Sequence, residues 1–133
     1  MKRFFVGLIM AIMFLGGSVV SASNADTNWT YANYADSGTT TWRPKDTNGN
    51  VYCYPQTGGS LYATVGASSY ASGSGHTAAS LKVLLKKGKR YTIINSVGAG
   101  RYARIKFQRY TSGGTVNTGK WSPDASADYN IVG

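Results

Sequence analysis

The chain has 133 residues, one cysteine, one histidine, five acidic residues and a formal net charge of +9. This length corresponds to a single domain, and one cysteine excludes an intramolecular disulfide framework. The acidic residues are all Asp, and together with one His and one Cys they are too few and too scattered to predict a metal site. No cofactor is therefore expected.

The N-terminus has the order of a secretory signal peptide. Lys2 and Arg3 are followed by an apolar run over residues 4–15 and by small residues up to Ala25. The run is shorter than the about 20 apolar residues that span a bilayer. The sequence therefore predicts a secreted, extracellular protein with a cleavable signal over residues 1–25 and one domain over residues 26–133. Cleavage after Ala22 stays open as an alternative to cleavage after Ala25.

Removal of this signal changes the composition of the chain. All three Met and three of the four Phe leave with it, whereas all ten Tyr and all three Trp remain. The mature domain keeps twelve Lys and Arg against five Asp, a net charge of +7. Export without disulfides favours a bacterial origin, and a Gram-positive one in particular.

The first half of the mature chain predicts three strands, over residues 29–34, 39–43 and 51–54. Pro44 is expected to end the second strand, and Asn48-Gly49 to form the tight turn into the third. Residues 55–60 are expected to form a loop. Cys53 lies in the third strand, where we expect a small buried hydrophobe, with a free thiol or an intermolecular bridge as alternatives.

Residues 61–67 alternate apolar and polar side chains and predict a strand, which a Ser/Gly/Ala-rich loop over residues 68–79 follows. Leu81, Val83 and Leu85 again have strand period, although Leu84 leaves a short helix open. Lys87-Gly88-Lys89 predicts a turn into a strand over residues 90–95, and residues 98–100 predict another turn.

Residues 101–110 form the clearest predicted strand, with an apolar face and a polar, basic face. Ser112-Gly113-Gly114 is expected to close a hairpin to residues 116–121, and residues 129–132 to add a last short strand. Seven or eight short strands joined by turns predict an all-β fold. We expect a small antiparallel β-sandwich, with a small barrel as the second choice.

The sequence holds few residues suited to catalysis. A nucleophilic pair of Cys53 and His76 is conceivable, but nothing in the sequence brings the two together. Asp124 could approach Asp36 or Asp46 to form the carboxylate pair of a glycosidase. Turn and capping roles are more common for Asp beside Pro, Gly or Asn. We therefore expect a protein that is not an enzyme.

The distribution of charge is more informative. No acidic residue lies between Asp46 and Asp124, a span that contains ten Lys and Arg. Two clusters are candidate ligand-binding sites: Tyr102, Arg104, Lys106 and Tyr110 on one face of the long strand, and Lys86, Lys87, Lys89 and Arg90 around a turn.

Cations next to aromatic rings suit an anionic polymer with a sugar-like or stackable backbone. For an exported protein we expect an anionic cell-wall polymer, a glycan or a membrane surface, and we rank nucleic acid below these because an exported protein seldom meets it. The alternative is that the cations only keep an exposed sheet soluble and protect its edges. The sequence does not define the oligomeric state.

Three segments carry a resemblance to a known family: Val51-Tyr52-Cys53-Tyr54-Pro55, residues 101–107, and the Gly-x-Trp-Ser-Pro-Asp motif of residues 119–124. They resemble a family of small secreted proteins from Gram-positive bacteria with a domain of unknown function. The resemblance implies a secreted all-β protein and no particular activity. Tyr31-Ala32-Asn33-Tyr34 is similar to bacteriocins of the lactococcin 972 type, which implies a secreted antimicrobial protein as the alternative function.

Overall fold

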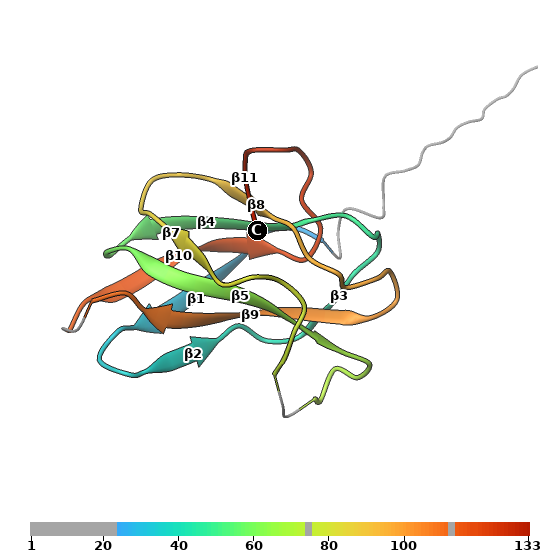
Figure 1. Ribbon diagram of the computed structural model, residues 1–133, viewed down its shortest axis with the longest axis horizontal. Helices are drawn as coiled ribbons and strands as arrows, with labels where there is room; N and C mark the ends of the chain where they lie inside the picture. Colours follow the sequence, from blue (N-terminus) through green and yellow to red (C-terminus); the bar gives the residue numbers. More distant parts are fainter. Residues whose placement is uncertain (1–23, 74–75, 112–113) are drawn as a thin grey trace, which may run out of the picture.

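The computed structural model describes residues 24–73, 76–111 and 114–133. Within these residues the chain forms eleven strands and no helix. The strands make two sheets, one behind the other in Figure 1, so the predicted β-sandwich is confirmed. The predicted signal peptide lies outside the described residues except for Asn24 and Ala25.

The sheet that we call sheet A has five strands in the order β1-β10-β4-β8-β11. Their bounds are Thr27–Ala32 for β1, Val116–Ser122 for β10, Val51–Thr57 for β4, Tyr91–Ile93 for β8 and Asn130–Val132 for β11. Neighbouring strands are antiparallel except β11, which runs parallel to β8. The expected all-antiparallel arrangement therefore holds for every pair in this sheet but one.

The second sheet, sheet B, has the order β2-β9-β5-β6, with β3 also paired to β9 and β7 to β5. Their bounds are Ser37–Thr39 for β2, Tyr102–Arg109 for β9, Leu61–Ser68 for β5, Thr77–Ala78 for β6, Arg43–Pro44 for β3 and Val83–Leu85 for β7. The long pairing of β5 with β9 forms the centre of the sheet, and every pair in it is antiparallel.

The core lies between the inner faces of the two sheets. Ala103, Ile105 and Phe107 alternate inward from β9, as the sequence predicted. The Phe107 ring packs against Trp29 of sheet A with ring centroids 4.2 Å apart. Burial of these apolar faces stabilises the sandwich by about 25 cal/mol for each Å² removed from water.

The predicted hairpin between the two long C-terminal strands is wrong. β9 belongs to sheet B, whereas β10 belongs to sheet A and pairs with β1 and β4. The connection therefore passes from one layer to the other. Gly-rich residues after a strand indicate that the chain turns, but they do not say whether it returns in the same sheet. Two residues of the expected turn, 112 and 113, lie outside the described residues.

Predictions around two prolines also need correction. The expected strand over residues 39–43 is divided into β2 and β3, and Pro44 is the last residue of β3 and not the first residue after the strand. β3 pairs with β9 and not with β4, so Asn48-Gly49 does not close a hairpin. Pro55 lies inside β4. Its carbonyl accepts the Gly88 amide at 2.8 Å on the side of β4 that faces β8. The pairing of β4 with β8 covers only Val51 to Cys53, so it does not reach Pro55. In an antiparallel strand, the amide and carbonyl of one residue point to the same side. The missing amide of Pro55 therefore costs no ladder hydrogen bond.

Smaller corrections concern the segments beside β5. The predicted loop of residues 68–79 contains β6, which pairs with β5. Val83 and Leu85 are buried in β7 as strand period requires, but Leu81 lies before the strand and is mostly exposed. The strand interpretation of this segment is thus confirmed over the helical one.

Cys53 is fully buried on the inner face of β4. Burial raises the pKa of its thiol, and an interaction with the Trp29 side chain opposes the shift. The prediction of a small buried hydrophobe is confirmed. A bridge to another chain would require the sandwich to open.

Asn24 and Ala25 contact the folded domain although the preferred cleavage site follows them. The Asn24 carbonyl accepts the Ser122 hydroxyl at 2.5 Å, and the Ala25 carbonyl accepts the Arg43 guanidinium at 2.6 Å. A mature chain cut after Ala22 keeps these hydrogen bonds, whereas a chain cut after Ala25 loses them.

Candidate functional site

The outer face of sheet B carries the first predicted cluster. Tyr102, Arg104 and Lys106 alternate outward and half-buried along β9, and Tyr110 follows the strand on the same side, half exposed. In the register with β5, Arg104 lies opposite Gly66. The structure therefore brings these four predicted residues onto one face.

Aromatic rings flank the cations at both ends of this face. At one end the Arg104 guanidinium lies 4.3 Å from the centre of the Trp42 ring. At the other end the Lys82 ammonium lies 4.8 Å from the Tyr62 ring, and Tyr110 meets the same ring edge-on at 5.5 Å. Such cation–π contacts hold the charged groups in place at about 0.5–1 kcal/mol each on an exposed surface.

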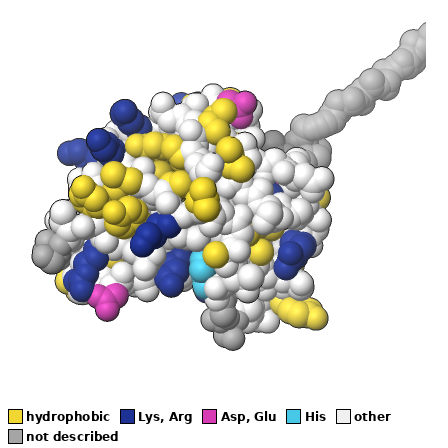
Figure 2. All heavy atoms as spheres, viewed as in Figure 1, with side chains coloured by type: hydrophobic (Ala, Val, Ile, Leu, Met, Phe, Trp, Pro, Cys, Tyr) yellow, Lys and Arg dark blue, Asp and Glu magenta, His cyan; other side chains and the backbone are white. Residues whose placement is uncertain are grey.

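We call this surface the basic face and define it by seven residues: Trp42, Tyr62, Lys82, Tyr102, Arg104, Lys106 and Tyr110. Figure 2 looks onto it, and Lys and Arg side chains surround a group of hydrophobic side chains there, with acidic side chains at the margin of the view. Asp36 pairs with Arg109 of β9. Sequence reasoning missed Trp42, Tyr62 and Lys82. The alternation of residues 61–67 turns Tyr62 outward, but the pairing of β5 with β9 is not visible in the sequence.

His76 lies on the same face, directly over Gly66. A Cβ atom on Gly66 would fall 2.4 Å from Cε1 of the imidazole, so only glycine leaves room for the ring in this position. Both ring nitrogens are inaccessible to solvent and have no hydrogen-bond partner among the described residues. Burial lowers the pKa of His76, and the charges of Arg104 and Lys106 lower it further.

The second predicted cluster lies elsewhere. Lys86, Lys87 and Lys89 are exposed around the turn that joins β7 of sheet B to β8 of sheet A. Arg90 stacks between two rings of sheet A, 5.2 Å from the centre of Tyr54 and 5.6 Å from that of Tyr129. Arg90 therefore lies with sheet A and not on the basic face.

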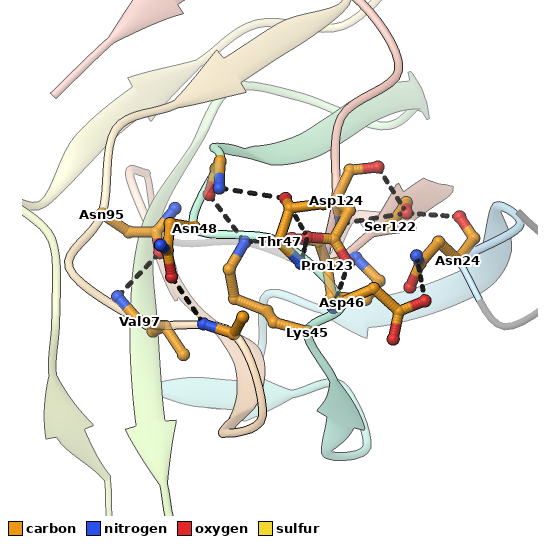
Figure 3. Close-up of polar contacts among 12 residues, drawn as sticks. Asn24, Lys45, Asp46, Thr47, Asn48, Asn95, Val97, Ser122, Pro123 and Asp124 are labelled. Atoms are coloured by element: carbon orange, nitrogen blue, oxygen red, sulfur yellow. Dashed lines mark hydrogen bonds and ion pairs between the residues drawn. The ribbon is translucent and has the colours of Figure 1, made fainter. Parts of the chain in front are cut away.

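A buried ion pair occupies one end of the sandwich (Figure 3). Lys45 is 1 % exposed, and its ammonium donates to the carbonyls of Gly49 at 2.6 Å and Pro123 at 2.7 Å and to the Asp124 carboxylate at 3.3 Å. These three acceptors match the three donors of a charged ammonium. No pattern in the sequence indicates this role of Lys45.

The Asp124 carboxylate also organises the loop that follows Lys45. It accepts the Asp46 amide at 2.9 Å and the Thr47 hydroxyl at 2.8 Å. Burial alone would raise the pKa of Asp124, but these hydrogen bonds and the charge of Lys45 outweigh it and lower the pKa. A glycosidase acid needs a raised pKa. Asp124 has the turn-capping role that the sequence favoured for it.

The Gly-x-Trp-Ser-Pro-Asp motif has a structural role at the same end. A Cβ atom on Gly119 would lie 2.2 Å from the Tyr54 carbonyl oxygen, and Trp121 is fully buried in the core. The Ser122 hydroxyl accepts the Asp124 amide at 3.2 Å. The motif therefore joins β10 to the core and to the loop after β3.

The remaining catalytic candidates are not brought together. Cys53 is buried between the sheets, whereas His76 lies on the outer face of sheet B, so the two form no nucleophilic pair. No group of three or more His, Cys or Asp side chains that could hold a metal ion occurs in the part of the chain that the structure describes. The described residues also include no helix long and apolar enough to cross a membrane.

A comparison with protein families gives one result. The family described as "Protein of unknown function (DUF2712)" matches residues 17–125, which include the basic face and the Gly-x-Trp-Ser-Pro-Asp motif. The chain belongs to this family. Neither the curated proteins nor the solved structures that were compared with it contain a match. The DUF2712 match thus supports the expected domain of unknown function, and it assigns no activity.

Proposed function

We propose that this protein is secreted, is not an enzyme, and binds an anionic or glycan component of the bacterial envelope through the basic face. One observation carries the proposal: Arg104, Lys106 and Lys82 share one sheet face with the rings of Trp42 and Tyr62. The predicted signal peptide adds the location, since an exported protein of a Gram-positive bacterium meets wall polymers and membrane surfaces first.

The size of the face supports an extended ligand. Gly66, beside Arg104, and Tyr62, beside Lys82, are four residues apart on β5. At about 3.4 Å for each residue of an antiparallel strand, the two aromatic–cation ends are roughly 13 Å apart. A polymer with repeated charges or rings can contact both ends at once, whereas a single small anion contacts one.

The test is binding of the purified mature protein to cell-wall and membrane fractions. Binding should weaken steeply between about 0.1 M and about 1 M salt, where the Debye length falls from about 10 Å to about 3 Å. Binding that does not change over this range would refute the charge-based mechanism.

A matched pair of variants distinguishes binding through the basic face from binding driven by the net charge of the protein. Lys106→Glu reverses a charge on the basic face, and Lys120→Glu makes the same change on the outer face of sheet A, where Lys120 bonds Asn28. We expect binding to fall with the first variant only. Equal losses would mean that net charge and not this surface drives binding. Inhibition of related strains by the free protein would instead favour the bacteriocin-like alternative.

A further inference from the structure

His76 holds an unfavourable position on the basic face. The ring lies against the backbone at Gly66, and both of its nitrogens are shielded from water without a hydrogen-bond partner among the described residues. A neutral imidazole has one donor and one acceptor to satisfy. A buried nitrogen that stays unsatisfied costs free energy, and a ligand that bonds it would recover that cost.

The charges that face His76 are all positive. Arg104 of β9 lies directly opposite Gly66, and Lys106 lies two residues further along the same strand. Neither β5, β6 nor the segment of residues 41–43 that carries Trp42 contains an acidic residue. In keeping with this environment, burial and the two cations lower the pKa of His76, so the ring is neutral at neutral pH.

We infer that His76, Arg104 and Lys106 form one binding subsite for a phosphodiester anion, and that His76 takes up a proton when the anion binds. The inference rests on the proposed function, since it names the ligand chemistry of the same face. A guanidinium presents a fork of donors that suits phosphate oxygens, and the stacking of Arg104 on Trp42 holds that fork in place. The imidazole turns away from Gly66 to reach the anion.

Proton uptake follows from reciprocal coupling between the two binding events. The negative charge of the anion offsets the two cations and favours the protonated imidazole, so the pKa of His76 is higher in the complex than in the free protein. The proton must then strengthen anion binding to the same degree. Affinity is therefore highest at pH values below the pKa of His76 in the free protein. It falls as the pH rises from that value through the pKa of His76 in the complex, and it is constant at higher pH.

The experiment is a calorimetric titration of the mature protein with soluble poly(glycerol phosphate) at several pH values between about 5 and about 8, on either side of the ordinary His pKa of about 6.5. The phosphodiester keeps its charge throughout this range, so any pH dependence comes from the protein. We expect affinity to rise about tenfold toward low pH for each unit by which binding raises the pKa of His76. Buffers of different ionisation enthalpy should report proton uptake.

Variants of the subsite provide the controls. His76→Gln should weaken binding and remove its pH dependence, and a purely structural role of His76 would not produce the loss of pH dependence. Gly66→Ala should push the imidazole off the sheet, since the nearest atom to the new Cβ belongs to the end of the His76 side chain. The single histidine resonance should then titrate closer to its ordinary pKa of about 6.5.

Vesicles that contain phosphatidylglycerol present the same phosphodiester as a lipid headgroup. pH-dependent binding of the polymer alone would assign a wall polymer, and pH-dependent binding of the vesicles alone would assign a membrane; either supports the subsite. Binding that does not vary with pH, or that varies equally in His76→Gln, overturns the subsite and leaves the proposed function standing. A failure to bind either probe at any pH overturns the subsite. The proposed function is overturned as well only if the protein also fails to bind the cell-wall and membrane fractions.

Discussion

Replacing Asp124 by Ala leaves the buried ammonium of Lys45 without its ionic partner. Lys45 is 1 % exposed, so water cannot replace the carboxylate without opening the end of the sandwich. Breaking a buried pair from one side destabilises proteins by about 3–5 kcal/mol. The lost hydrogen bonds to the Asp46 amide and the Thr47 hydroxyl are exposed to solvent, so they add little. We therefore expect Asp124→Ala to lower the free energy of unfolding by about 3–5 kcal/mol.

Urea denaturation followed by Trp fluorescence measures this change, because Trp29 and Trp121 are both buried in the core. The exposed pair of Asp36 and Arg109 is the matched control. Asp36→Ala should cost no more than about 1 kcal/mol, as is usual for surface ion pairs. Equal losses for the two carboxylates would refute the reasoning. The double change of Lys45→Met with Asp124→Ala should recover most of the lost stability, since apolar groups can replace a buried pair.

Four further outcomes are expected. Folding lowers the pKa of Asp124, so its contribution to stability is complete above its unfolded pKa of about 3.9 and is lost as the pH falls through the folded pKa. In urea denaturation across the acid range, the free energy of unfolding should depend less on pH for Asp124→Asn than for the wild type. Gly119→Ala should destabilise by about 1–3 kcal/mol through overpacking, whereas Gly59→Ala, with open space around it, should have little effect in the same assay. The Cys53 thiol should not react with an aromatic disulfide reagent in the native protein and should react fully in denaturant, and rapid native reaction would contradict its burial. A mature chain that begins at Ser23 should be more stable than one that begins three residues later, and the N-terminus of the secreted product can be read by mass spectrometry.

The alternation of apolar and polar side chains predicted the strands well where one face is buried and the other is exposed to solvent. The alternation of residues 101–110 places Ile105 inward and Arg104 outward, and the structure confirms both. The same patterns failed where the partner of a strand mattered. Pro55 looked like the start of a loop because nothing in the sequence shows that β8 begins beyond it. The predicted hairpin after Tyr110 failed for the same reason, because local turn residues do not choose between two sheets.

The sequence by itself determined the all-β class, the inward and outward faces of β9, and the row from Tyr102 to Tyr110, because side-chain alternation depends only on backbone geometry. Tertiary structure alone decided what lies next to that row. The register of β5 with β9 puts Gly66 beside Arg104 and leaves room for His76, and the loop after β3 brings Lys45 to Asp124. These contacts join residues far apart in the chain, and their pairing depends on the packing of whole sheets.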